Sequence, residues 1–208
     1  MTEQVSAAEL WDTRYRESER IWSGNPNKAL VREVSDVEPG TALDLGCGEG
    51  ADAVWLARRG WSVTATDVSQ VALDRAAGHA AEENVGDRID WQWHDLAVSF
   101  PEGAFDLVST HFLHSHGEMP RERILRTAAG AVSPGGTLLI VGHSGRPTWE
   151  VPPDFDVELP ASKDVLAALE LAPGEWEVQV CEEHERPHPA PDGSPGMWVD
   201  AVVKVRRR

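Results

Sequence analysis

The chain has 208 residues, which is enough for one well-buried domain and too few for two full-sized domains with a linker. Its 35 acidic and 19 basic residues give a formal net charge of −16, and such a surface repels polyanions, which disfavours nucleic acid as a substrate. No apolar run has the length of a membrane span, and residues 1–4 lack the basic and apolar regions of a secretory signal. Two cysteines give no disulfide framework, so we expect a cytoplasmic protein.

Short β-branched runs alternate with stretches of helix-forming residues, which indicates an α/β sheet. The predicted strands span residues 41–45, 62–66, 89–93, 105–110 and 137–142. The predicted helices span residues 8–19, 28–35, 51–59, 70–82, 120–132 and 162–169. Loops rich in Gly, Asp or His follow the strands, and in such sheets ligands bind at the carboxyl ends of the strands.

The C-terminal part of the chain follows a different pattern. Two strand-like runs at residues 175–183 and 197–205 are joined by the loop 186–196, which cannot hold a crossover helix. Two strands joined only by a loop are expected to pair antiparallel. The proline-rich residues 149–160 before them are predicted to form either an ordered surface loop near the active face or a plain connector.

The most informative motif is a strand-to-helix turn in which three glycines follow Asp44 at alternate positions, Gly46, Gly48 and Gly50. Glycines spaced so closely let backbone amides approach a ligand without interference from Cβ atoms. Asp67 ends the next strand roughly 20 residues further on, where its carboxylate can accept hydrogen bonds from both hydroxyls of a ribose. Together these residues predict a nucleoside pocket.

Carboxylates crowd this turn. Asp44, Glu49 and Asp52 would repel the pyrophosphate of a dinucleotide but suit a cofactor that carries cations, such as a sulfonium and an ammonium. Cys47 is predicted to be a small filler of the turn, because the neighbouring carboxylates raise the pKa of its thiol and suppress the reactive thiolate.

The motif at residues 44–50 resembles the acidic-x-Gly-x-Gly-x-Gly first motif of the class I S-adenosylmethionine-dependent methyltransferases. Residues 11–15, 105–108 and 134–138 also resemble segments of that family, so the likeness covers most of the chain. Within the family, the length and the N-terminal tryptophans look closest to the small single-domain enzymes of the tellurite-resistance and thiopurine type.

The resemblance implies a Rossmann-like fold, a seven-stranded, mostly parallel sheet with helices on both faces and a C-terminal antiparallel hairpin. It implies one domain over residues 1–208, with N-terminal helices and a lid in 1–40, the cofactor-binding core in 41–145, and a substrate loop and the hairpin in 146–208. The cofactor would be S-adenosylmethionine. The acceptor would be a small molecule with a sulfur, nitrogen or oxygen nucleophile, methylated by direct in-line displacement. We expect a monomer or a homodimer.

The resemblance also implies contacts to the cofactor. Asp44, or a water that it holds, would face the ammonium group of the donor, and residues 46–50, Cys47 included, would line its methionine arm. Val68 would lie against the adenine face. Asp95 would accept a hydrogen bond from the exocyclic amine, or else be a solvated loop residue.

Further expected contacts lie around the mouth of the pocket. Leu96 would pack on the adenine ring, and Thr110 would meet the methionine part by its position after the fourth strand. Trp11, Tyr15 and Trp22 belong to a segment that by resemblance folds over the cofactor as a lid. Trp11 and Tyr15 fall on one helix face, which ordinary core packing would produce equally well.

His111, His114 and His116 gather where the acceptor is expected to approach. Three interpretations stay open: a general base, a metal site completed by His143, and polar lining of an aqueous mouth. The spacing H-x-x-H-x-H is not a dependable zinc pattern, so we predict no metal. Our prediction is that His111 or His114 orients or deprotonates the acceptor.

Two other classes of protein are alternatives. Residues 46–51 also fit the G-x-G-x-x-A pattern of NAD(P)-dependent oxidoreductases, which the glycines alone do not exclude. Asp44 and the C-terminal hairpin argue against that class. The alternative that is not an enzyme is a regulatory domain that binds a nucleoside without catalysing a reaction.

Overall fold

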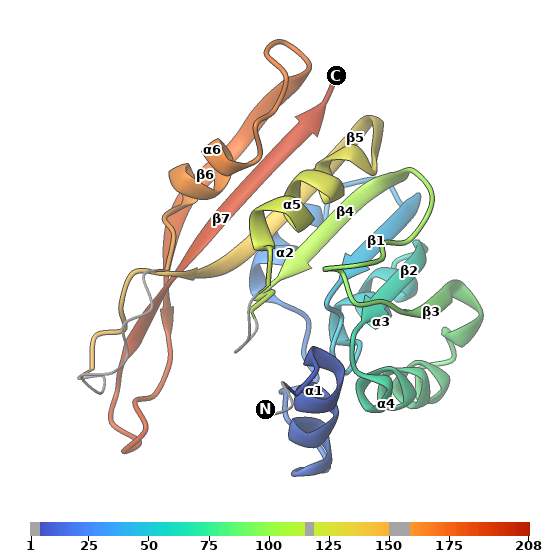
Figure 1. The fold of residues 1–208 in the computed structure, drawn as a ribbon, viewed down its shortest axis with the longest axis vertical. Helices are drawn as coiled ribbons and strands as arrows, with labels where there is room; N and C mark the ends of the chain where they lie inside the picture. The colour runs from blue at the N-terminus through green and yellow to red at the C-terminus, as the bar shows by residue number, and fades with distance from the viewer. Residues whose placement is uncertain (1–4, 115–118, 150–158) are drawn as a thin grey trace.

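The computed structural model describes residues 5–114, 119–149 and 159–208. These residues form a seven-stranded sheet in the order β3-β2-β1-β4-β5-β7-β6 (Figure 1). The strands are β1 (Thr41–Leu45), β2 (Ser62–Asp67), β3 (Ile89–Trp93), β4 (Phe105–His111), β5 (Val132–Ser144), β6 (Trp176–Pro187) and β7 (Met197–Arg207). Strands β1 to β5 are parallel, and β7 is antiparallel to both β5 and β6. The predicted fold class is confirmed, with its C-terminal hairpin.

Helices cover both faces of this sheet. They are α1 (Ala7–Arg16), α2 (Lys28–Val34), α3 (Ala51–Arg58), α4 (Gln70–Glu82), α5 (Arg121–Gly130) and α6 (Ser162–Ala168). Successive side chains of β1 enter two different cores: Ala42 packs in a cluster with Leu30 and Leu56, and Leu43 packs in a cluster with Leu125. This burial on both faces is typical of a parallel strand. In the described part of the chain, no helix is both long and apolar enough to cross a bilayer.

The boundaries of β5 and α5 differ from the sequence prediction. Strand β5 begins at Val132 rather than at residue 137, because Val132 pairs with Phe105 before the ladder resumes where Thr137 pairs with Leu107. The residues between these two pairs bulge out of the ladder. Helix α5 therefore ends at Gly130, before the predicted boundary at residue 132.

Two further boundaries shift for identifiable reasons. Helix α1 ends at Arg16 rather than at residue 19, and the carbonyl of Tyr15 is taken by a hydrogen bond from Arg75. Strand β6 continues to Pro187, into the predicted loop, because Pro187 stays paired with Met197 of β7.

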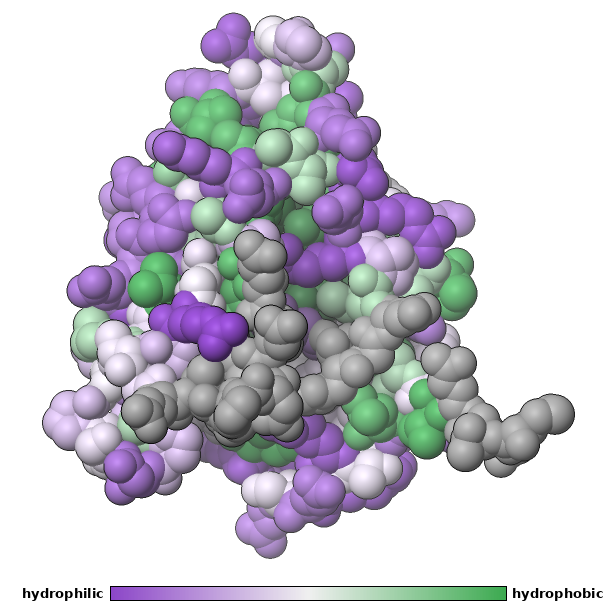
Figure 2. Space-filling model, turned by 60° about the vertical axis from the view of Figure 1, so that its left-hand side comes forward, coloured by the Kyte–Doolittle hydropathy of each residue, from purple (hydrophilic) through white to green (hydrophobic). Residues whose placement is uncertain are grey.

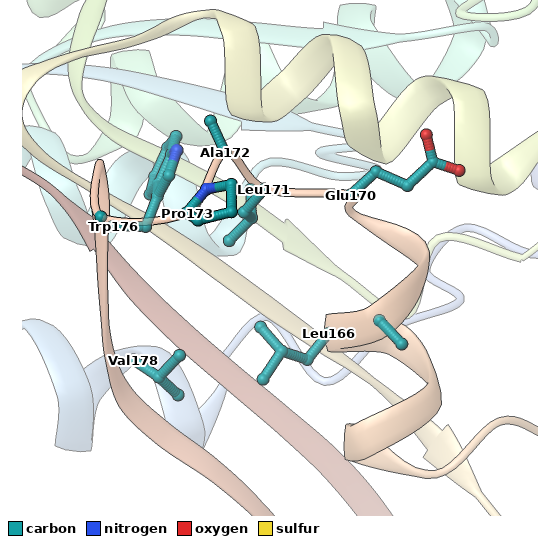
Figure 3. A pocket seen from close by; sticks show the side chains of 9 residues that line it. Leu166, Glu170, Leu171, Ala172, Pro173, Trp176 and Val178 are labelled. Atoms are coloured by element: carbon teal, nitrogen blue, oxygen red, sulfur yellow. The ribbon is translucent and has the colours of Figure 1, made fainter.

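An apolar recess of about 360 Å³ lies between α6 and β6. Figure 2 views the molecule with the side that carries α6, β6 and β7 turned forward, and hydrophobic side chains lie near its upper end. In Figure 3, Leu166 of α6 and Val178 of β6 face each other across the recess. Trp176, which lines the recess, pairs with Arg207 of β7. The adjacent residue Arg206 pairs with Thr137, in the first half of β5. The recess therefore lies at the opposite end of the sheet from the carboxyl ends of the parallel strands.

Candidate active site

The turn after β1 lies at the point where the strand order reverses. Strand β1 has β2 on one side and β4 on the other, and ligands of doubly wound sheets bind in the crevice at such a point. The amides of Gly46 and Cys47 both donate to the carbonyl of Thr66, at 2.8 and 2.9 Å, which ties the turn to β2. Gly46, Gly48 and Gly50 have φ angles of 74°, 53° and 83°, in the left-handed region that favours glycine.

Two side chains approach this turn so closely that a Cβ atom would not fit. A Cβ at Gly48 would lie 2.9 Å from the hydroxyl oxygen of Tyr15, and a Cβ at Gly46 would lie 2.8 Å from Cδ1 of Leu113. Tyr15 belongs to α1, and Leu113 follows β4. The turn is therefore contacted by both the N-terminal segment and the loop after β4.

Asp67 lies at the end of β2 and is fastened to the turn. Its carboxylate accepts hydrogen bonds from the amides of Gly48 and Ser69, each at 2.9 Å. Burial raises the pKa of Asp67, and these backbone hydrogen bonds act in the opposite direction. A carboxylate has about four lone-pair sites, so two remain for the hydroxyls of a ribose.

The carboxylates predicted to surround the turn are not equivalent. Asp44 is 2% exposed, and no described residue donates a hydrogen bond to its Oδ2. Burial and the charge of Asp52 raise the pKa of Asp44 to about 8. Asp52 instead accepts from the backbone and the side-chain nitrogen of Asn27, both at 2.7 Å, and pairs with Nδ1 of His111 at 3.1 Å. Asp52 thus has hydrogen-bond and ion-pair partners within the protein, whereas Oδ2 of Asp44 has no hydrogen-bond partner among the described residues.

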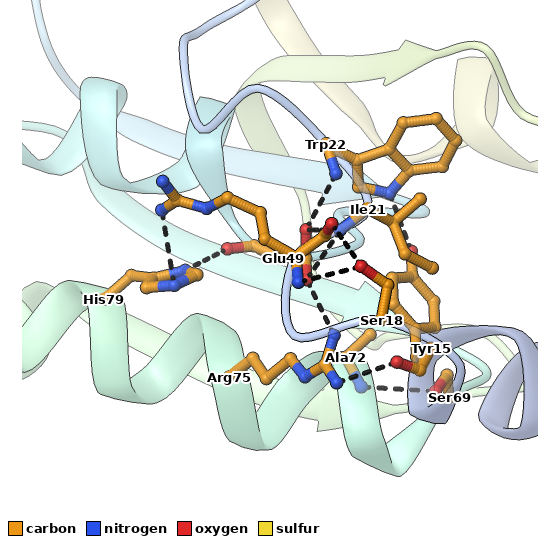
Figure 4. Close-up of polar contacts among 10 residues, drawn as sticks. Tyr15, Ser18, Ile21, Trp22, Glu49, Ser69, Ala72, Arg75 and His79 are labelled. Carbon is orange, nitrogen blue, oxygen red and sulfur yellow. Dashed lines mark hydrogen bonds and ion pairs between the residues drawn. The ribbon is translucent and has the colours of Figure 1, made fainter.

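The third carboxylate, Glu49, fastens the N-terminal segment over the turn (Figure 4). It accepts from the amides of Ile21 and Trp22 at 3.2 and 3.0 Å and pairs with Arg75 of α4 at 2.9 Å. Arg75 also donates to the carbonyl of Tyr15 at 2.7 Å, and Nε1 of Trp22 donates to the Tyr15 hydroxyl oxygen at 3.0 Å. Of the three carboxylates predicted around the turn, Glu49 and Asp52 therefore have partners within the protein, and Oδ2 of Asp44 has none among the described residues.

A second anchor holds α1 against α4. Ser69 caps α4, and its hydroxyl donates to Asp12 of α1 at 2.6 Å. The ring of Trp11 lies 6.1 Å from that of Tyr15, centroid to centroid. Tyr15 is 2% exposed whereas Trp22 is 46% exposed. Tyr15 is therefore packed against the turn, and Trp22 forms the open edge of this segment.

His111, at the end of β4, belongs to the buried charge cluster rather than to an open mouth. It is 8% exposed and pairs with Asp52. Burial opposes its positive charge, but Asp52 and Asp44 prevail and raise the pKa of His111.

His114 and His143 lie at the same end of the sheet, after β4 and near the end of β5. The ring of His114 stacks on that of His143 at 5.5 Å and 8°. Burial, followed by the charges of His143 and Arg121, lowers the pKa of His114 to about 4, so its imidazole is neutral at physiological pH. His116 is outside the described residues. Within those residues, no group of three or more His, Cys, Asp or Glu side chains is arranged to hold a metal ion.

Four other predicted contacts surround the same end of the sheet. The carbonyl of Val68 accepts from Nε1 of Trp93 at 2.7 Å. Asp95 accepts from the backbone amide two residues later at 2.9 Å, and Leu96 is partly buried against the core. Thr110 is 1% exposed, and its hydroxyl has no hydrogen-bond partner among the described residues.

Comparison with known proteins agrees with this geometry. The family model of a methyltransferase domain matches residues 42–136. A ubiquinone biosynthesis O-methyltransferase of Caulobacter sp. (strain K31) is 39% identical over 149 residues, 64% of this chain and 58% of the relative. A structure from work on the conversion of a disulfide bond into a thioacetal group during echinomycin biosynthesis has a TM-score of 0.75 and 26% identity, over 97% of this chain and 92% of that one. The chain is therefore similar to the class I S-adenosylmethionine-dependent methyltransferase family, over residues 42–136 in the family model and over almost its whole length in fold.

The likeness to this methyltransferase family is broad in fold and narrower in sequence. The chain spans less than two thirds of the length of the Caulobacter relative. The structure of TehB from Haemophilus influenzae has a TM-score of 0.72 over 98% of this chain and 68% of that one, at 18% identity, which shows a shared fold. The closer placement among tellurite-resistance and thiopurine enzymes stays a prediction.

The residues of the turn fit S-adenosylmethionine, the cofactor of this methyltransferase family. The buried Oδ2 of Asp44, without a partner in the described structure, is the acceptor that an ammonium group requires. The left-handed glycines expose backbone to a ligand, and Asp67 keeps two acceptor sites for ribose hydroxyls.

Sequence reasoning missed the residues that position this site from a distance in the chain. Arg75 was not singled out, although it holds Glu49 and the Tyr15 carbonyl. Asp200 and Arg186, which surround His143, were missed as well. The opposite charge of Glu49 and Arg75 was visible, but no local spacing marks two residues 26 positions apart as partners.

Proposed function

We propose that this chain transfers a methyl group from S-adenosylmethionine to a sulfur, nitrogen or oxygen atom of a small-molecule acceptor. The observation that carries the proposal is the buried carboxylate of Asp44 beside the glycine turn, whose Oδ2 has no hydrogen-bond partner among the described residues. Ionising a buried carboxyl group that lacks a partner is costly, and the ammonium group of the donor would offset that cost. The Caulobacter relative's name, an O-methyltransferase of ubiquinone biosynthesis, supports a small organic acceptor.

Each predicted contact keeps its proposed role. Asp44 receives the donor's ammonium and Asp67 its ribose, and His111 or His114 meets the acceptor. The other proposed cofactor contacts are Gly46, Cys47, Gly48, Gly50, Val68, Asp95, Leu96, Thr110, Trp11, Tyr15 and Trp22. The division into residues 1–40, 41–145 and 146–208, the state of monomer or homodimer, and the cytoplasmic location also stay predictions.

The bound cofactor supplies an electrophilic methyl group on a sulfonium. The chain's own part is to hold the two reactants at near-attack distance and to exclude water. Tyr15 and Trp22 are hydrogen bonded to each other over the glycine turn, and Glu49 fixes the backbone of Trp22. Closing this segment over the cofactor removes solvent from the methyl group, and a weak base is then sufficient for catalysis.

Calorimetric titration tests the proposal. We expect S-adenosylmethionine and S-adenosylhomocysteine to bind, and reduced nicotinamide cofactors not to bind. Intact-mass analysis of acceptors incubated with protein and S-adenosylmethionine should detect the gain of one methyl group. Binding of a nicotinamide cofactor alone would assign the chain to the oxidoreductases, and cofactor binding with no acceptor methylated would favour the regulatory domain.

A further inference from the structure

A polar cluster joins the last three strands of the sheet. Asp200 of β7 accepts from Nε of Arg186 of β6 at 2.6 Å, and its other oxygen lies 3.2 Å from Nδ1 of His143 of β5. Burial acts to raise the pKa of Asp200, but the hydrogen bonds from His143 and Arg186 lower it, so the carboxylate is ionised at neutral pH. An ionised carboxylate only accepts hydrogen bonds, so Nδ1 of His143 donates to Asp200, and in the neutral tautomer Nε2 is the nitrogen that can accept a proton.

The backbone places these groups accurately. His143 and Asp200 are directly opposite each other in the antiparallel β5–β7 ladder, and Arg186 lies on the neighbouring strand. Arg186 also lies over the ring of Phe112, 5.5 Å from its centroid. Rigid strands thus hold the imidazole, the carboxylate and the guanidinium together, which is the arrangement of a base with an orienting acid.

Aromatic rings surround the His143 imidazole. The rings of Trp198 and Phe112 lie 4.5 and 4.6 Å from it, centroid to centroid. Trp149 meets Trp198 at 5.3 Å and 68°, and His188 stacks near Trp149 at 5.5 Å. The His143 side chain is still 27% exposed, so a ligand can reach it. Walls of this kind bind planar aromatic molecules through stacked and edge-on contacts.

The residues after β4 connect this cluster with the cofactor turn. Phe112 has a φ of 52°, an uncommon conformation for a residue with a Cβ atom, and its amide donates to the carbonyl of Val141 at 2.8 Å. Phe112 packs on His143, while the next residue, Leu113, lies against Gly46. A molecule bound at the aromatic rings would therefore lie beside the turn that holds the methionine part of the cofactor.

We propose that this cluster is the acceptor site, that it takes planar aromatic acceptors with a weakly acidic hydroxyl group, and that His143, rather than His111 or His114, is the catalytic base. The inference rests on the proposed function and specifies its acceptor. A fixed base is needed for a hydroxyl group, which is a poor nucleophile until it loses its proton, and is dispensable for a thiolate. Asp200 and Arg186 are positioning residues, because they act through His143.

The reaction balances without a further reactant. The hydroxyl oxygen of the acceptor forms a bond to the methyl carbon while the carbon–sulfur bond breaks and its electron pair goes to sulfur. The hydroxyl proton goes to Nε2 of His143, and the resulting imidazolium faces the ionised Asp200. The products are an aryl methyl ether and neutral S-adenosylhomocysteine, and the proton then leaves to solvent.

The test compares two acceptors that differ in their need for a base. Methyl transfer is measured at pH 7.5 to 4-methoxyphenol, which is protonated at that pH, and to 4-nitrophenol, which is largely ionised. In His143→Gln we expect kcat for 4-methoxyphenol to fall about 100-fold or more, the usual contribution of a general base, and kcat for 4-nitrophenol to fall less than about fivefold. Asp200→Asn should lower kcat for 4-methoxyphenol with KM unchanged, and should spare 4-nitrophenol. Equal losses for both acceptors would overturn the role of His143.

A binding measurement separates failure of this inference from failure of the proposed function. 4-Methoxyphenol is titrated by calorimetry into protein saturated with S-adenosylhomocysteine. We expect it to bind the wild type, Trp198→Phe to bind nearly as well, and Trp198→Ala to bind about tenfold more weakly. The matched control is Trp176→Phe, a tryptophan at the far end of the sheet, which should bind like the wild type.

Each remaining outcome decides between the two claims. If S-adenosylhomocysteine binds and another small acceptor is methylated, but neither phenol binds or is methylated, the aromatic acceptor site is wrong and the proposed function stands. If no donor binds the wild type, both claims are overturned.

Discussion

The glycine turn after β1 and the His143 cluster on β5, β6 and β7 lie at the same end of the sheet, where the parallel strands finish, but they are built differently. The turn is shaped by residues near one another in the chain and by backbone amides, such as those of Gly46 and Cys47 on Thr66. The His143 cluster is assembled from three strands, and His143 and Asp200 are 57 positions apart. A cofactor site made from local backbone geometry can serve many acceptors, whereas an acceptor site made from strand register can change by substitution of single side chains. The two sites should therefore respond independently to mutation.

Asp67→Ala should have the largest effect, and the effect should be confined to cofactor binding. The change removes the acceptor of the Gly48 and Ser69 amides as well as the proposed ribose contact. Charge-assisted hydrogen bonds contribute about 1.5–3 kcal/mol each, so we expect the Kd for S-adenosylmethionine to rise at least about 100-fold. Calorimetry measures the loss, with the surface variant Asp74→Ala on α4 as control. A Kd within threefold of the wild type would remove Asp67 from the cofactor site.

Asp44→Asn tests whether the unpaired carboxylate receives a cation. The folded-state pKa of about 8 lies above the ordinary value of 3.8, so the folded protein holds a proton that the unfolded chain releases. The free energy of unfolding without cofactor should therefore fall as the pH rises from about 4 to about 8, and less so in Asp44→Asn. Denaturant unfolding at pH 5 and pH 8 compares the two proteins.

With the cofactor present, Asp44→Asn should be unfavourable, because it weakens the binding of S-adenosylmethionine. A cationic ligand prefers ionised Asp44, so the wild-type affinity for S-adenosylmethionine should increase from pH 6 to pH 8. Asp44→Asn should bind about 30-fold more weakly at pH 8, the loss of one charge-assisted hydrogen bond, and should show little of this pH dependence. An equal pH dependence in both proteins, measured by calorimetry, would assign the titration to another group.

Local patterns of sequence were sufficient to predict the glycine turn, and they failed for interactions set by tertiary register. The closely spaced glycines Gly46, Gly48 and Gly50 indicate a tight turn by their residue type alone. Asp67 follows at the spacing found in α/β folds that bind nucleosides. In the sequence pattern, Glu49 is one more acidic residue of the turn. Its function as the anchor of Trp22 depends on how the N-terminal segment docks on α4, which no periodicity encodes.

The contrast between His111 and His143 has the same origin. Both follow buried strands, and sequence alone gave them similar standing. Only the ladder that brings Asp200 opposite His143, and the buried pairing of His111 with Asp52, distinguish their surroundings. A strand register depends on the packing of the whole sheet, so the ion pairs that it creates are not visible in a linear sequence.

Glu49→Gln should have a moderate effect, again on the cofactor side. The amide keeps one acceptor for the Ile21 or Trp22 amide but loses the charge that pairs with Arg75. A loss of about 1–1.5 kcal/mol predicts dissociation of S-adenosylmethionine about tenfold faster, because the covering segment opens more often. Stopped-flow dissociation and hydrogen exchange at residues 21 and 22 measure the effect. The exposed residue Glu82 of α4 gives the matched control, Glu82→Gln, and unchanged exchange at residues 21 and 22 in Glu49→Gln would show that Glu49 does not hold the segment.

Val178→Lys should have the smallest effect. It tests whether a position far from both sites influences cofactor or acceptor binding. Val178 is 51% exposed in the apolar recess between α6 and β6, at the end of the sheet opposite both sites. A lysine there can extend its ammonium into water while its stem covers the apolar surface, so we expect little change in stability. The Kd for S-adenosylmethionine and the KM for a phenol should both stay within about twofold of the wild type, as expected for substitutions at independent, distant positions. A larger change in KM alone would mean that the recess is coupled along β6 to Arg186 and the acceptor site, and a larger change in Kd alone would contradict the independence of the two halves of the sheet.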